Sequence, residues 1–426
     1  MKNNILKLLR KNLNQDTIQG MLSIIVVATV LILGTNVGKL IDFSVFFGLA
    51  LAFAAKNVTE WLAKLIDAKL EEVLKLELNY DKLIKMYPRC NDFLEYENSS
   101  EANFILGRKK SNVKFKEDKK NPNIINQDKY TFPIVLDKMC NKEKFSIIDS
   151  QNQYNLPEEV RQNYADIMSA HTHSNVYNQL NIRLDNLKLN ESINVIELST
   201  SRTTYFDSLV TNRAMDYKWK SGVCNRDLFA YGPFIPKLEE SVLSNHLGFN
   251  GFIETRDKKI VFVKRNDSVS IGKGTLGTSI AASLKCMYAL DDNKNFTKEG
   301  LIKGIERELL DELGINAEYT FSLEENIISI YRDMVEGGKP QLLFYINIDL
   351  TSNEVAEAFA YTEVINKSII TDKMKRDGEQ LVFVDKAELQ KIYLAPDVIV
   401  IGENAYSTMP STSASIVMLI KYFNKQ

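Results

Sequence analysis

Two apolar runs near the N-terminus constrain this chain more than any other feature. No charged residue lies between Ile18 and Val37, and a second, shorter apolar run extends from Phe43 to Ala55. A helix of about 20 uncharged residues has the length needed to cross the hydrocarbon core of a bilayer. We therefore expect residues 1–56 to form a transmembrane hairpin of two helices.

Basic residues on both flanks of the hairpin set its orientation. Lys7 and Lys11 precede the first run, and Lys56 and Lys64 follow the second. Positive flanks favour the cytoplasmic side. The sequence thus predicts a multi-pass protein of the inner or plasma membrane, with its soluble part in the cytoplasm. Two alternatives remain open: a cleaved signal peptide with a basic start, and a buried pair of hydrophobic helices in a soluble domain.

Composition limits the remaining possibilities. A chain of 426 residues is long enough for two or three domains. Its formal net charge of −2 gives no basic excess, so nucleic acid is not an expected partner. The four cysteines include no CxxC pair, which argues against a disulfide framework or a zinc site and favours a reducing compartment.

The pattern after the hairpin suggests three further parts. Residues 57–88 have apolar residues at helical spacing and predict an amphipathic stalk that ends at Pro88. The stalk either packs on its own domain or associates with other copies in a homo-oligomer. Residues 89–179 form a mixed intermediate region without a clear period. Alternating strands begin at about residue 180 and lead into a last domain, 180–426, with a core at about 245–426.

The stretch NKNFTKEGLIKGIERELLDELGI, residues 293–315, carries the chemistry. Thr297 is suited to cap the start of a helix and Gly314 to end it. Between them, apolar residues recur on one face. Glu308, Asp311 and Glu312 follow at i, i+3 and i+4, so their carboxylates share a neighbouring stripe. Such oxygen ligands suit Mg²⁺ or Mn²⁺, which can bind a phosphate and activate water.

This stretch resembles the Nudix box, G-x5-E-x7-R-E-U-x-E-E-x-G-U, where U is a bulky aliphatic residue. The matching residues are Glu299, Arg307, Glu308, Leu309, Glu312, Gly314 and Ile315. Asn293 stands in place of the first glycine, and Asp311 in place of the first glutamate of the EE pair. The Pro-Gly-Gly-like segment usual before the box is replaced by TSIAASLK, which has no glycine.

The resemblance implies a fold and a set of residue roles. The expected fold is an α/β/α sandwich around a mixed sheet. Glu308 and Glu312 carry over as catalytic metal ligands, with Asp311 as a third ligand. Glu299 and Arg307 carry over as the structural pair of the motif, which would fasten the loop to the helix.

The resemblance does not assign the catalytic base or the phosphate contacts to single residues. The catalytic base varies within the family, so Glu312, Glu324 and Glu325 are all candidates. Lys273 and Lys339 follow or lie within glycine-rich loops and are candidate contacts for phosphate. Neither the base nor the sugar of the ligand can be read from these residues.

Two functions agree with the whole pattern. The first is a membrane-anchored Nudix-type hydrolase that cleaves a nucleoside diphosphate linked to another moiety, with Mg²⁺ or Mn²⁺. The second is a Nudix-like sensor that binds a nucleotide and changes the state of the membrane hairpin, a layout that resembles effectors of bacterial defence signalling. An inactive Nudix scaffold that mediates assembly is a third.

Overall fold

The computed structural model of the chain describes residues 62, 75–102, 114–115, 128–171, 177–266, 272, 274–316, 319–369 and 378–425. The chain divides into two units, Met1–Lys75 and Leu76–Gln426, and the description below concerns the second. The predicted hairpin, residues 1–56, lies outside the described residues. Among the helices that are described, none has the length and apolar character needed to cross a membrane.

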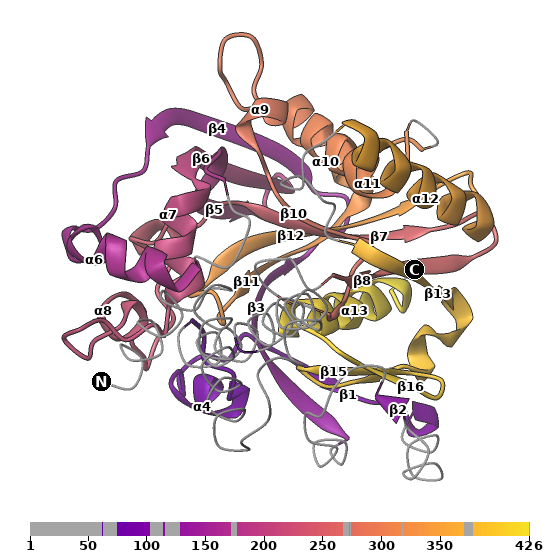
Figure 1. Ribbon diagram of the computed structural model, residues 1–426, viewed down its shortest axis with the longest axis horizontal. Coiled ribbons are helices and arrows are strands. Elements are labelled where there is room, and N and C mark those ends of the chain that lie inside the picture. Colours follow the sequence, from indigo (N-terminus) through magenta and orange to yellow (C-terminus); the bar gives the residue numbers. More distant parts are fainter. Residues whose placement is uncertain are drawn as a thin grey trace, which may run out of the picture. The chain divides into compact units, whose positions relative to one another are not determined.

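A mixed sheet of nine strands forms the centre of the second unit (Figure 1). Every neighbouring pair is antiparallel except β12 and β7, which run parallel. In spatial order the main strands are β1 (Phe93–Glu97), β3 (Lys129–Met139), β11 (Ile327–Asp333), β12 (Lys339–Asn347), β7 (Gly248–Glu254), β8 (Lys259–Arg265) and β13 (Gly378–Asp385). Two short strands complete the sheet: β10 (Ile280–Ser283) pairs with β7, and β9 (Leu276–Gly277) pairs with β8.

Helices cover both faces of this sheet (Figure 1). Helices α10 (Lys298–Leu313) and α12 (Ser352–Ile369) lie on one face and α13 (Pro410–Phe423) on the other. Successive strand residues point to opposite faces. Phe249 of β7 accordingly packs in the core beneath α10, and Phe252 packs in the core beneath α13. The predicted mixed α/β architecture with a helix–sheet–helix sandwich is confirmed for the described residues.

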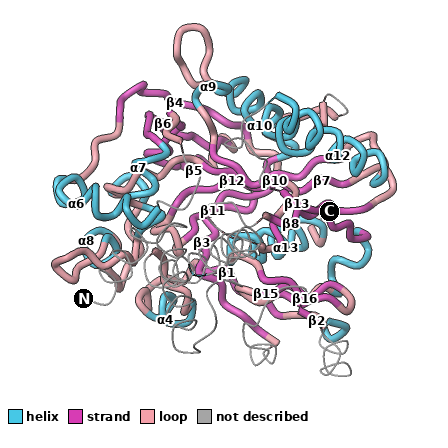
Figure 2. The backbone as a smooth tube through the Cα atoms, in the orientation of Figure 1, coloured by secondary structure: helices cyan, strands magenta, loops and turns pink. Residues whose placement is uncertain are grey.

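Two smaller sheets flank the sandwich (Figure 2). One contains, in order, β4 (Lys144–Gln153), β6 (Val195–Thr204) and β5 (Leu180–Asn190). A strand does start at residue 180 as expected, but β1 to β4 already precede it. Ile182 and Leu198 of this sheet belong to the same hydrophobic core as α10. The other sheet contains β14 (Tyr393–Leu394), β15 (Val398–Ile401), β16 (Asn404–Ser407) and β2 (Lys114–Phe115).

Short helices occupy the connections. The α-helices are α4 (Tyr80–Lys85), α6 (Glu158–Met168), α7 (Tyr205–Val210), α8 (Asn225–Phe229), α9 (Cys286–Ala289) and α11 (Leu323–Asn326). The 3₁₀ helices are η3 (Ser169–His171), η4 (Asn212–Ala214), η5 (Leu238–Glu240) and η7 (Lys386–Lys391). Of these, α9 and α11 lie closest to α10 in the chain and bear directly on the candidate site.

The C-terminal end of the predicted stalk, residues 57–88, is not the continuous helix that the sequence predicts. Residues 76–79 are not helical, and α4 begins only after Asn79, whose side chain accepts a hydrogen bond from the Lys82 amide. Leu83 and Tyr87 are buried and pack beside the turn between β11 and β12. Burial of these two side chains attaches the segment to the folded unit, so no continuous helix runs through 76–79 to residue 86. Apart from Leu62, residues 57–74 lie outside the described part.

The region expected to be intermediate, 89–179, supplies two strands of the central sheet. Residues 134–139 of β3 pair with β11, so β3 lies between β1 and β11 in the sheet. A partly buried ion pair, Arg332 Nη2 to Asp137 Oδ1 at 3.0 Å, joins the same two strands. The sheet therefore combines residues from both sides of the boundary predicted at 180.

Candidate active site on helix α10

Local sequence is sufficient to form α10. The Thr297 side chain accepts a hydrogen bond from the Gly300 amide at 3.2 Å, and Gly314 adopts a left-handed φ of 73° after the last turn. Both predicted ends of the helix are confirmed. Leu301, Ile305 and Leu309 are fully buried, which anchors the helix on the sheet. The acidic stripe next to this apolar face therefore has a fixed position.

The first turn of α10 makes an unusually close contact with α9. A Cβ atom on Gly300 would lie 1.9 Å from the carbonyl oxygen of Ala289, so only glycine fits there. This close approach places Lys285, just before α9, and Tyr288, within α9, beside the second half of α10. The segment before the box thus supplies side chains to the acidic stripe.

Glu308 is paired with a lysine. Its side chain is only 3% exposed, and Lys285 Nζ lies 2.5 Å from Glu308 Oε1. Burial opposes the charge on Lys285, but the attraction of Glu308 outweighs it and raises the pKa of the lysine. Lys285 therefore stays charged, and the buried Glu308 side chain has a protein cation as its neighbour.

Asp311 is also neutralised by the protein. Arg307 Nη2 lies 3.0 Å from Asp311 Oδ1, one turn earlier on the same helix. The Tyr288 hydroxyl donates a hydrogen bond to Asp311 Oδ2 at 3.3 Å. Lys285 and Arg307 each lie 5.5 Å from the centre of the Tyr288 ring, within range of a cation–π contact. These residues and Glu308 form one cluster of alternating charge around an aromatic ring.

Glu299 lies away from this cluster. It stands in the first turn of α10, where its own backbone amide and Thr297 lower the pKa of the exposed carboxyl group. Eight residues of helix separate it from Arg307, a distance of about 12 Å along the axis. The direct pair of Glu299 and Arg307 suggested by the motif is therefore not formed between these two described side chains.

Glu312 has different surroundings. Together with Arg265 and the backbone of Gly277, it lines a small cavity between the end of α10 and strands β8 and β9. The volume of the cavity is about 30 Å³, enough for a water molecule but not for a nucleotide. This is the position on α10 where a carboxylate, a guanidinium and space for water come together.

The carboxylates as arranged do not fit the expected metal. Among the described residues, no three Asp, Glu, His or Cys side chains converge in a way that could hold an ion. A Mg²⁺ ion would need to lie about 2.1 Å from a carboxylate oxygen. At Glu308, Lys285 Nζ already occupies that side of the carboxylate at 2.5 Å. Two cations would repel at such a separation, so Glu308 in this arrangement does not offer a metal site.

The other candidate residues lie elsewhere. Lys273 lies outside the described residues. Lys339 is buried at the start of β12, with Nζ 3.6 Å from Glu336 Oε2, and as placed it does not face an open surface. Glu324 pairs with Lys298 at 3.9 Å. Glu325 pairs with Lys142 at 2.8 Å. Lys298 begins α10, so Glu324 lies at the opposite end of the helix from Glu312.

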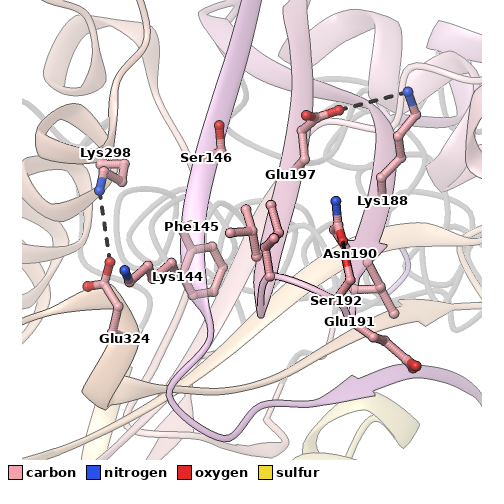
Figure 3. Close-up of a pocket in the computed structure, with 13 residues that line it drawn as sticks. Lys144, Phe145, Ser146, Lys188, Asn190, Glu191, Ser192, Glu197, Lys298 and Glu324 are labelled. Atoms are coloured by element: carbon pink, nitrogen blue, oxygen red, sulfur yellow. Dashed lines mark hydrogen bonds and ion pairs between the residues drawn. The ribbon is translucent and has the colours of Figure 1, made fainter.

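A wide groove opens near this first turn of α10 (Figure 3). Its volume is about 1190 Å³, and β4, the β5–β6 hairpin and α11 contribute to its walls. The ion pairs Lys298–Glu324 and Lys188–Glu197 lie on opposite sides of it. Ten helical residues, about 15 Å, separate Lys298 from Glu308. The groove is therefore distinct from the acidic stripe.

Sequence reasoning identified the carboxylates but missed two of their partners, Lys285 and Tyr288. Both belong to AASLKCMY, which has no recognisable motif. The available signal was indirect: three carboxylates on one helical stripe require nearby cations. Which cation supplies the charge depends on the contact between α9 and α10, and that contact is not evident from local sequence.

Comparison with known proteins gives little further information. No family model matches the chain, and no curated protein matches it. A crystal structure of the Deinococcus radiodurans protein DR0079 is similar at 12% identity and a TM-score of 0.21, over 33% of this chain and 66% of that protein. The crystal structure of the MutT protein from Methanosarcina mazei Go1 is similar at 11% identity and a TM-score of 0.23, over 42% of this chain and 96% of that protein. Scores this low decide neither fold nor function.

Proposed function

We propose that residues 180–426, together with the strands added by 89–179, form a Nudix-type domain that hydrolyses a nucleoside diphosphate linked to another moiety. The observation that carries this proposal is the position of Glu312. It ends the acidic stripe of α10 and lines a water-sized cavity beside Arg265. The box-like spacing of residues 299–315 and the helix–sheet–helix layers support the same assignment.

The chemistry assigned to these two residues is simple. Glu312 would accept a proton from a water molecule as the water oxygen forms a bond to phosphorus. The bridging P–O bond breaks, and the leaving group departs as a phosphate. Arg265 would stabilise the negative charge that develops on the phosphoryl oxygens. Mg²⁺ or Mn²⁺ is implied by the motif, but Glu308 as placed does not offer it a site.

A sensor is the second candidate, and one observation favours it. Lys285 and Arg307 neutralise Glu308 and Asp311, so these two side chains do not offer the metal site that hydrolysis by this motif implies, and a domain that binds its ligand without turnover fits this arrangement. In that case the ligand would act on the N-terminal part of the chain. The predicted hairpin would anchor the chain in the inner or plasma membrane with this domain in the cytoplasm, and its helices or stalk would bring copies together.

Incubation of the purified full chain with a nucleotide panel tests the proposal. The panel contains nucleotide sugars, dinucleoside polyphosphates and cyclic oligonucleotides, each with Mg²⁺ or with a chelator, and products are separated by ion-exchange chromatography. We expect cleavage of one class and a loss of about 100-fold in kcat for Glu312→Gln. Glu158→Gln, an exposed glutamate on α6 that pairs with Arg161, is the matched control and should retain full activity.

The same experiment separates the two candidates. Binding of one nucleotide without any product, measured by calorimetry, would replace the hydrolase with the sensor. Neither binding nor cleavage of any nucleotide would contradict both. Cleavage that persists unchanged in Glu312→Gln would contradict the role assigned to that carboxylate.

A further inference from the structure

Lys285 lies where the fold leaves little room for another cation. It follows β10 and precedes α9, and its backbone forms a bridge with Asn181 at the start of β5. Its side chain is 20% exposed, whereas that of Glu308 is 3% exposed. Since α9 contacts α10 through Gly300, the backbone that carries Lys285 is held from two sides. The ammonium group is therefore fixed against the carboxylate rather than extended into solvent.

Electrostatics require a cation at this place. A buried carboxylate without a partner is strongly destabilising, and removing one member of a buried pair leaves the other uncompensated. Lys285 meets this requirement at Glu308. A divalent ion would meet it equally well, because it would bind the same oxygen at a shorter distance. The two cations compete for one position, and the one linked to the chain has the advantage of a fixed location.

We propose that Lys285 is the built-in counter-ion of Glu308 and occupies the position in which a divalent ion would otherwise bind. Glu308 is then not a metal ligand in this protein. Loss of the Lys285 charge exposes a divalent-cation site at Glu308. The proposal concerns only this ion pair, and its identification with a metal position rests on the proposed Nudix-type assignment of α10.

Manganese binding to the full chain, without any nucleotide, tests the proposal. We expect Lys285→Met to bind Mn²⁺ at least about tenfold more tightly than the wild type in calorimetry. In a chelator its melting temperature should fall, and millimolar MnCl₂ should restore it. Lys298→Met is the matched control: its lysine is 45% exposed and only 3.9 Å from Glu324, so neither affinity nor melting temperature should change.

A second variant keeps the test decisive if Lys285→Met does not fold. In the wild-type background, Glu308→Gln should leave Mn²⁺ affinity unchanged, because Glu308 binds no metal there. A tenfold or larger loss of Mn²⁺ affinity in Glu308→Gln would overturn the proposal. So would a folded Lys285→Met that gains no Mn²⁺ affinity. Neither readout involves a nucleotide, so failure here is distinct from failure of the proposed hydrolase.

Discussion

At the residue scale, Asp149 connects the flanking sheet to the segment that leads into α10. Its two carboxylate oxygens each accept a hydrogen bond from Arg202 at 2.6 Å. The Phe296 amide, one residue before the cap of α10, donates to the same carboxylate at 2.8 Å. Burial opposes the charge, but the hydrogen bonds from Arg202, Phe296 and Thr200 outweigh it and hold the pKa of Asp149 below its usual 3.8.

The lowered pKa gives a pH-dependent prediction for Asp149→Asn. A carboxyl group with a lowered folded-state pKa adds stability that is present above the unfolded pKa and is lost as pH falls through the folded pKa. Because Asp149 is only 6% exposed and Arg202 3% exposed, breaking the pair should cost about 3 kcal/mol at pH 7. Urea unfolding of both proteins should show this difference shrinking below about pH 3.8.

Arg161→Ala is the control for this measurement. Arg161 pairs with Glu158 at 2.8 Å, but both side chains are about 60% exposed, so its removal should change stability by less than about 0.5 kcal/mol. A wild-type advantage over Asp149→Asn that stays constant down to pH 2.5 would show that the charge of Asp149 contributes nothing.

At the scale of a single element, the two glycines of α10, Gly300 and Gly304, should respond differently to substitution by alanine. The reason is that one faces a backbone atom and the other a flexible side chain. Alanine in a helix normally adds stability of about 1 kcal/mol over glycine. At Gly300 the new Cβ would lie 1.9 Å from the Ala289 carbonyl oxygen, a backbone atom that cannot move alone. We expect Gly300→Ala to destabilise the protein by about 2 kcal/mol in thermal or urea unfolding.

Gly304→Ala supplies the comparison on the same helix. Its Cβ would lie 2.4 Å from Leu284 Cδ1, the end of a flexible side chain that can rotate away. Its effect on stability should therefore stay within about 1 kcal/mol. Equal effects of the two substitutions would mean that α9 does not hold the first turn of α10 as tightly as the structure indicates.

The same helix shows what sequence could and could not predict. Its start, its end and its apolar face follow from Thr297, Gly314 and the spacing of the leucines, because capping and periodicity are local properties. The contacts of its carboxylates depend on α9, and the place of β3 depends on pairing with a strand nearly 200 residues later. Such long-range contacts leave no local pattern, so Lys285 and β3 were not anticipated.

At the scale of the whole molecule, the central sheet contains strands from both sides of the domain boundary expected at residue 180. Strand β11 has two neighbours, β12 from its own hairpin and β3 from residues 129–139. If the chain began at residue 180, the open edge of β11 would expose a row of unpaired backbone groups. The partly buried Arg332 would also lose Asp137, its partner at 3.0 Å. Residues 76–179 are thus needed to complete the sheet, although the Nudix-like motif lies wholly beyond them.

Truncation therefore tests the architecture directly. We expect residues 180–426 expressed alone to aggregate or to lack a cooperative thermal transition, because one edge of the central sheet is uncovered and part of the shared core is missing. Residues 76–426, with the sheet complete, should melt in one transition by circular dichroism and differential scanning calorimetry. A soluble 180–426 fragment with the same melting temperature would show that β1 and β3 are an accessory layer. The boundary read from the motif would then be the physical one.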